Sequence, residues 1–251
     1  MKKVFISGSI SIKKLPVVVE ESLDNIFKEG MEILVGDADG IDTMVQNYCK
    51  RANYGKVTVY SIYPTPRYMV NGFNKKYIKP KSDSKKEREL QKEKDEAMTL
   101  DSEYSFVIWD GKSKGSFSNV VRALENNKKI KLYLSDINGY MQQSKITKTE
   151  IEFIYRKNNG YSAAEVVEYL KSIGENFFPY TRAFNKKLID HKIIKKEDVV
   201  YVPMPKYKKL FMIDKYRGKV TGIRFTNEFI DWVEKWVKKI RPPEEPNLFN
   251  V

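Results

Sequence analysis

Short apolar segments alternate with helical segments through the first half of the chain, and this alternation constrains the fold more than any other feature. The helical stretches place apolar residues at helical spacing, as Ile41, Val45 and Tyr48 do. Such alternation implies right-handed crossovers between parallel strands. We therefore predict an α/β fold in residues 1–137, a Rossmann-like parallel sheet of about five strands with helices on both faces. The predicted strands are residues 3–7, 31–35, 57–62, 104–109 and 130–134.

The pattern changes after Ser135. Amphipathic helices are predicted near residues 162–173 and 179–191, followed by strands at 199–202 and 209–225, with a hairpin turn in KYRGKV. Thr226 is a suitable N-cap for a final helix. These elements predict a small basic α+β domain at residues 147–241, and prolines predict an extended tail at 242–251.

Composition excludes several classes of protein. No segment approaches the roughly 20 apolar residues that span a bilayer, and the polar start is unlike a signal peptide, so a cytoplasmic location with no membrane partner is expected. A single Cys49 and a single His191 argue against a disulfide, a zinc or iron–sulfur site and Ser-His-Asp or Cys-His catalysis. No metal or cofactor is predicted.

The net charge of +13 concerns partners rather than the fold. Residues 145–251 hold 22 Lys and Arg against 14 Asp and Glu, so the excess lies towards the C-terminus. Binding to a polyanion is one interpretation, because Lys and Arg displace counterions from phosphates. A lysine-rich solvated surface is the alternative.

Three loops rich in Gly, Ser and Asp follow predicted strands, at residues 7–11, 36–42 and 110–116. In an open parallel sheet, ligands bind beyond the carboxyl ends of the strands. Glycine lets the backbone approach a phosphate, and a helix start offers N–H groups to an anion. Tight strand-to-helix turns are the alternative. The predicted nucleotide-binding residues are Gly8, Ser9, Gly36, Gly40, Asp42, Gly111, Lys112, Ser113, Gly115 and Ser116.

Two longer segments resemble a known family. VGDADGIDTMVQNYCKR, followed by KVTVYSIYPTPR, resembles the glycine-rich segment of DNA processing protein A, and FVIWDGKSKGSFSNVVRALENNKKIKLYL resembles a later segment of that family. LOG proteins and nucleoside deoxyribosyltransferases share this layout within the SLOG superfamily. Over about residues 3–135 the resemblance implies a site for a nucleotide, nucleoside or nucleic-acid strand, and it makes a homodimer an expectation.

The resemblance leaves catalysis open. LOG-type phosphoribohydrolases are similar in the third loop, but aligning Gly115 and Ser116 with their G-T places Asn119 where they carry a catalytic Glu. Cleavage of an N-glycosidic bond needs a carboxylate near the anomeric carbon. A solvated face of a charged helix is the alternative for Asp95 and Asp101, and a helix-capping role for Asp42. The catalytic candidates are Asp37, Asp39, Asp95, Asp101 and Asp110. Deoxyribosyltransferases are similar in placing an Asp shortly before the fourth strand, where Asp95 or Asp101 stands.

The C-terminal pattern resembles a winged helix or the C-terminal domain of phage antirepressors. The second predicted helix there would present Arg182, Lys186 and Lys187 to nucleic acid, as Lys112 and Lys114 would in the third loop. A supporting or dimerising domain is the alternative.

Three functions are therefore carried forward. The first is a nucleotide-binding SLOG-type protein that cleaves or transfers at an N-glycosidic bond. The second is a non-catalytic protein that binds single-stranded DNA. The third is a phage or defence-related protein that captures a nucleotide signal.

Overall fold

The computed structural model describes residues 1–81 and 86–241. The chain divides into two compact units, Met1–Tyr155 and Arg156–Val251, which we call unit 1 and unit 2. The division falls within α5 (Lys148–Asn159), a helix that we did not predict. The predicted tail at 242–251 lies outside the described residues. None of the described helices has the length and apolar character needed to cross a membrane.

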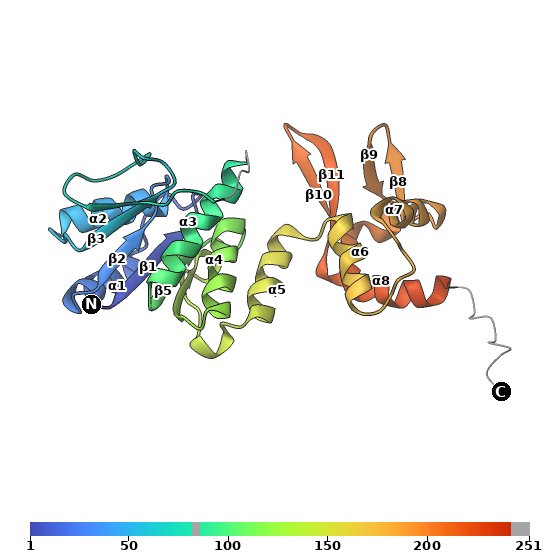
Figure 1. Ribbon diagram of the computed structural model, residues 1–251. Coiled ribbons are helices and arrows are strands. Elements are labelled where there is room, and N and C mark those ends of the chain that lie inside the picture. Colours follow the sequence, from blue (N-terminus) through green and yellow to red (C-terminus); the bar gives the residue numbers. More distant parts are fainter. Residues whose placement is uncertain (82–85, 242–251) are drawn as a thin grey trace. The chain divides into compact units, whose positions relative to one another are not determined.

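Unit 1 is built on a seven-stranded sheet in which six strands are parallel and the last, β7, runs antiparallel to β6. The five predicted strands form its centre, which confirms the Rossmann-like α/β fold (Figure 1). The order across the sheet is β4 (Asn74–Tyr77), β3 (Val57–Ser61), β2 (Glu32–Val35), β1 (Lys3–Gly8), β5 (Tyr104–Trp109), β6 (Lys129–Leu134) and β7 (Gly139–Tyr140).

The two edge strands are those that the sequence analysis missed. Strand β4 has the sequence NKKY with every residue exposed, so it offers no apolar run to detect. Strand β7 has only two residues and pairs with the end of β6 after a short turn. By contrast, all five residues of β3 are buried, which is why the central strands are plain in the sequence.

Helices cover both faces of the sheet, as predicted. Their apolar residues decide which face each helix covers: Leu23 and Val45 pack with Ile6 on one face, whereas Val120 packs with Val107 on the other. Helix α3 joins this second face through Met98. The helices are α1 (Val17–Lys28) and α2 (Ile41–Arg51) on the first face, and α3 (Glu87–Asp101) and α4 (Lys114–Glu125) on the second.

Unit 2 has a core of aromatic side chains, with Phe184, Phe225 and Phe229 fully buried. Thr226 caps the last helix by accepting a hydrogen bond from the Phe229 N–H at 3.2 Å, as predicted. Two antiparallel hairpins are present where the sequence analysis predicted one, because β8 was not foreseen. The elements are α6 (Ala163–Ser172), α7 (Thr181–Asp190), β8 (Ile194–Glu197), β9 (Val200–Pro203), the short helix η3 (Pro205–Leu210), β10 (Phe211–Tyr216), β11 (Lys219–Phe225) and α8 (Asn227–Ile240).

Candidate functional site

The loops after β1, β2 and β5 meet at one edge of the sheet because these parallel strands are neighbours. The chain leaves β1 towards β2 on one side and returns to β5 on the other, and ligands bind at such a switch point. A pocket of about 380 Å³ lies there, which we call the loop pocket. Its volume falls within the roughly 300–1,000 Å³ of small-molecule sites. The predicted site residues that line it are Gly8, Asp39, Asp42, Asp95, Ser113, Gly115 and Ser116.

Helix α3 forms a wall of the loop pocket that the sequence analysis did not assign to the site. Its contribution beyond Asp95 is Glu87, Arg88, Gln91, Lys94 and Met98. The available signal was that Gln91, Lys94 and Asp95 share a helix face with the apolar Met98, because residues three and four apart lie on one side of a helix. Charged residues on the inward face of a helix need polar or charged partners, so this pattern is the signal that α3 contributes to a polar site.

Two buried polar atoms in the loop pocket lack a hydrogen-bond partner among the described residues. They are the Oγ of Ser7, at the end of β1, and the Oε1 of Gln91. Ser7 as a whole is only 5% exposed. Because buried polar groups are nearly always satisfied, two such atoms make the loop pocket a candidate site for a polar ligand.

Lys94 stands at the centre of a buried charge cluster. Its side chain is 4% exposed, and its Nζ lies 3.5 Å from Oδ1 of Asp37 and 3.9 Å from Oδ1 of Asp95. A Cβ atom on Gly36 would stand 2.3 Å from Oδ2 of Asp42 and 2.8 Å from the Lys94 Nζ. Gly36 is therefore required by the packing of these side chains over the backbone.

Asp42 and Asp95 are the two carboxyl groups of the loop pocket whose pKa values are raised. Burial raises the pKa of Asp42 to about 6, although the positive charge of Lys94 opposes this. Burial also raises the pKa of Asp95, against the charges of Lys94 and Arg122. Two neighbouring carboxyls with raised pKa values are typical of sites that handle protons.

Asn119 lies in the wall of the loop pocket, at the position where the family resemblance would require a Glu. Its side chain is hydrogen-bonded to Asp95, which opposes the rise in the pKa of that carboxyl without cancelling it, and its Oδ1 accepts a hydrogen bond from Arg122 at 2.6 Å. A carboxyl group thus lies beside the Asn119 amide, contributed by α3 rather than by α4.

Asp37 lies beneath the loop pocket rather than in its wall, since it is fully buried and does not line it. It accepts hydrogen bonds from the Ser61 hydroxyl at 2.7 Å and from the Arg67 guanidinium at 2.9 Å. Burial by itself would raise the pKa of Asp37, but these bonds and the charge of Lys94 hold it below the ordinary value. Asp37 therefore positions the loops after β2 and β3.

Asp110 has a similar positioning role between the loops after β1 and β5. Its carboxylate accepts hydrogen bonds from the hydroxyls of Ser9 and Ser11 at 2.9 and 2.5 Å. The main-chain N–H groups of Lys112 and Ser113 also donate to it, at 2.9 and 2.7 Å. Burial would raise its pKa, but these four bonds lower it. With its oxygens engaged in this way, Asp110 is absent from the pocket wall.

The N-terminus of α4 faces the loop pocket without a side-chain cap. Ser113 is the N-cap residue and makes no capping hydrogen bond, so the first main-chain N–H groups of the helix keep their capacity for an anion. Lys112 and Lys114 are exposed beside them, although neither lines the pocket. Trp109, at the end of β5, is fully buried and donates its Nε1–H to the Ser113 carbonyl at 3.0 Å, so its ring is not exposed for stacking on a base.

The remaining predicted residues of unit 1 lie outside the loop pocket. Ser9 is buried and its hydroxyl lies 3.1 Å from that of Ser116, while Gly40 and Gly111 occupy the turns before α2 and after Asp110. Asp101 forms ion pairs with Lys3 and Lys76, both at 2.9 Å, and does not line the pocket. Nothing in this part of the chain forms a metal centre: among the described residues no group of three or more His, Cys, Asp or Glu is placed to hold an ion.

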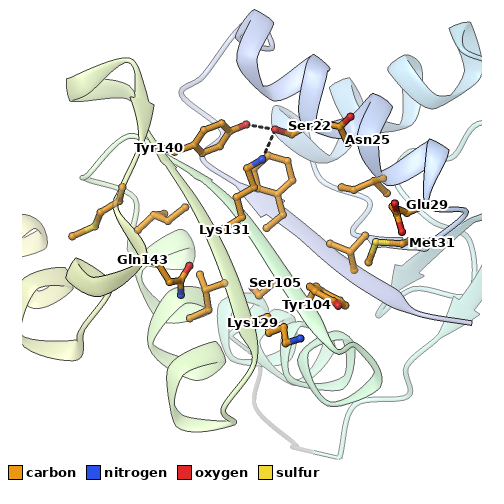
Figure 2. A pocket seen from close by; sticks show the side chains of 16 residues that line it. Ser22, Asn25, Glu29, Met31, Tyr104, Ser105, Lys129, Lys131, Tyr140 and Gln143 are labelled. Atoms are coloured by element: carbon orange, nitrogen blue, oxygen red, sulfur yellow. Dashed lines mark hydrogen bonds between the residues drawn. The ribbon is translucent and has the colours of Figure 1, made fainter.

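A second cavity of about 560 Å³ lies on the face of the sheet that α1 covers only in part. Phe106 and Tyr104 form part of its lining, and Lys131 donates to the Ser22 hydroxyl at 2.7 Å, which in turn lies 2.6 Å from the Tyr140 hydroxyl (Figure 2). It is larger than the loop pocket and mainly apolar. None of the predicted site residues reaches it, so the loop pocket is the candidate site.

The predicted nucleic-acid residues of unit 2 lie on α7. Arg182 and Lys186 are exposed, whereas the Nζ of Lys187 stands 5.9 Å from the centre of the Phe177 ring. They belong to a different unit from the loop pocket.

Comparison with known proteins adds one structural likeness. No protein-family model matches the chain, and no curated protein does. Among solved structures, DNA processing protein A from Helicobacter pylori, described as binding single-stranded DNA, matches with a TM-score of 0.39 and 18% sequence identity. The match covers 76% of this chain and 81% of that one. A likeness at this level does not indicate the function of the chain.

Proposed function

We propose that unit 1 binds a nucleotide or nucleoside in the loop pocket. The observation that carries the proposal is the pair of unsatisfied buried atoms, Ser7 Oγ and Gln91 Oε1, which line the same pocket as Asp42 and Asp95. Hydroxyl and amide oxygens of this kind suit the donors and acceptors of a base or a sugar. The uncapped start of α4 suits a phosphate.

The carboxyl pair extends this proposal to chemistry at an N-glycosidic bond. Because Asp42 has a pKa of about 6, it can hold a proton near neutral pH and pass it to a leaving base. Asp95, when ionised, stabilises the positive charge that develops at the anomeric carbon. Water then adds to the anomeric carbon, and its released proton restores the protonated form of Asp42. Lys94, between the two groups, favours the state in which one carboxyl is ionised.

The test is to incubate the protein with a panel of nucleotides and nucleosides, separate the products by chromatography for released base, and record thermal-shift stabilisation in parallel. We expect at least one compound to raise the melting temperature, and the same compound to lose its base. In the Asp95→Asn variant the thermal shift should persist while base release falls by about 10²-fold or more.

The control is Asp136→Asn, because Asp136 is an exposed carboxylate of unit 1 that does not line the loop pocket. This variant should retain both binding and base release. Stabilisation without base release by the wild-type protein would leave the binding proposal standing and contradict the chemistry. If no compound stabilised the protein, nucleotide binding itself would be refuted.

A second candidate, binding of single-stranded nucleic acid at the same edge, is favoured by the exposure of Lys112 and Lys114 beside the α4 start. Strand binding should weaken steeply as salt rises, whereas a mononucleotide held by a few contacts should be much less sensitive. Replacing both lysines by Ala should then reduce affinity for an oligonucleotide. Unchanged affinity would exclude this loop as the contact.

A further inference from the structure

Positive charge in unit 2 is concentrated on its two hairpins and on the short helix η3 that joins them. Residues 192–224 hold ten Lys and Arg against three Asp and Glu, a balance of +7 in 33 residues, out of +13 for all 251. Every one of the ten cationic residues is exposed. The excess therefore lies in one continuous stretch that covers β8, β9, η3, β10 and β11.

Few of these cations are neutralised by a neighbouring carboxylate. Lys195 pairs with Glu197 at 2.5 Å, and Arg224 pairs with Asp214 at 3.0 Å. Within residues 1–81 and 86–241 no ion pair is found for the other eight. They are Lys192, Lys196, Lys206, Lys208, Lys209, Lys215, Arg217 and Lys219.

The fold of unit 2 places the two hairpins side by side. Strands β9 and β11 share a small cavity of about 170 Å³, lined by residues that include Tyr201 and Thr221. Both hairpins project to the same side of unit 2, away from α8 (Figure 1). Arg217 and Gly218 form the turn at the end of β10–β11, beside Tyr216, which is 65% exposed. Four of the eight unpaired cations thus lie on the hairpins, three lie on η3, which joins β9 to β10, and Lys192 lies just before β8.

We propose that these two hairpins bind the phosphate backbone of duplex DNA, a function separate from nucleotide binding in unit 1. Unpaired exposed Lys and Arg gain most from contact with phosphates, because they release condensed counterions and lose no existing ion pair. A two-stranded ribbon also has the dimensions to enter the major groove, which is about 12 Å wide.

A duplex fits these hairpins better than a single strand. Proteins that bind single strands stack successive bases on rows of aromatic side chains. Among the described residues of the two hairpins, Tyr216 is the one exposed aromatic side chain. The Cζ of Arg217 lies 5.4 Å from the centre of its ring. One aromatic residue among eight unpaired cations is a surface for backbone contacts rather than for stacking.

The test measures binding of the full chain to a labelled duplex of about 20 base pairs, two helical turns, by fluorescence anisotropy at several salt concentrations. The variant combines Lys215→Gln, Arg217→Asn and Lys219→Gln. Asn is chosen because φ is +49° at Arg217, a conformation that Asn tolerates. The matched control, Lys235→Gln with Lys238→Gln and Lys239→Gln, removes the same charge from α8. A third variant replaces Arg182, Lys186 and Lys187 of α7 by Gln.

We expect wild-type affinity to fall by at least about tenfold between 50 and 200 mM salt, because several phosphate contacts are made. In the hairpin variant, the slope of log affinity against log salt should decrease by about 3, one for each lost contact. The α8 control should keep the wild-type slope.

Three results would overturn the proposal. One is a decrease in the salt slope of the α8 control as large as that of the hairpin variant, which would show a general effect of net charge. Another is loss confined to the α7 variant, which would place the contacts on that helix. The last is tighter binding of a single strand of the same sequence than of the duplex. Circular dichroism of each variant checks that its content of helix and strand matches that of the wild-type chain.

Discussion

Replacing Asp42 by Asn should stabilise unit 1 at neutral pH. The Asp42 carboxyl is packed over the Gly36 backbone within the charge cluster of Lys94, and burial raises its pKa from 3.8 to about 6. Ionising it in the folded state therefore costs more than ionising it in the unfolded chain. Asn removes this cost and can still accept the hydrogen bond that the Ala38 N–H donates at 3.3 Å.

The size and pH range of the effect follow from the two pKa values. Their difference is about 2.2, which at 1.36 kcal/mol per pH unit gives an upper limit of about 3 kcal/mol. The folded state binds the proton more tightly, so wild-type stability falls as pH rises from about 4 to about 6 and is constant above that. The advantage of Asp42→Asn should grow across this range and then remain constant.

Urea unfolding at a series of pH values between 4 and 7.5 measures this advantage. Of the three tryptophans, Trp109 lies in unit 1, whereas Trp232 and Trp236 lie in unit 2. Both proteins should therefore carry Trp232→Phe and Trp236→Phe, so that Trp109 alone reports on unit 1 and the background cancels. An advantage that is independent of pH, or a wild-type protein that is the more stable at pH 7, would refute the reasoning.

Three further predictions concern the residues around the loop pocket. Asp110→Ala should lower the free energy of unfolding by about 2–3 kcal/mol at neutral pH, because four hydrogen bonds are lost; chemical denaturation measures this, and a loss below 0.5 kcal/mol would contradict it. Lys94→Met should lower the free energy of unfolding by about 3–5 kcal/mol, since its carboxylate neighbours lose a buried partner. Adding Asp95→Asn should restore part of that loss; a double variant no more stable than the single one would show that the two residues are not coupled. Ser7→Ala should leave the melting temperature within a few degrees of wild type, because the Ser7 hydroxyl makes no hydrogen bond among the described residues. It should lower the affinity for the nucleotide that stabilises the wild-type protein; unchanged affinity would show that Ser7 is not part of the site.

The fold of unit 1 was predictable because its central strands are buried on both faces. Their apolar runs and the helical spacing of residues such as Ile41 and Val45 are properties of the local sequence. The edge strand β4 carries no such signal, because pairing at a sheet edge uses main-chain groups and its side chains remain in water.

The site was predictable only in outline. The sequence placed three loops at one edge of the sheet, but it could not show that Asp37 and Asp110 face the protein while Asp42 and Asp95 face the pocket. The partners that separate these roles come from distant parts of the chain, as Ser9 and Ser11 do for Asp110. The burial of Lys94 likewise depends on where α3 packs, which its highly charged sequence does not reveal.

The bonds that Asp110 makes to the loop after β1 affect more than stability. Because Ser9, Ser11, Lys112 and Ser113 all donate to one carboxylate, the two loops that flank the start of α4 are held in a single conformation before any ligand arrives. Ordering a loop on binding would cost conformational entropy, and a wall that is already ordered avoids that cost. Loosening this link, as in Asp110→Ala, should therefore reduce ligand affinity without removing a single atom from the pocket wall.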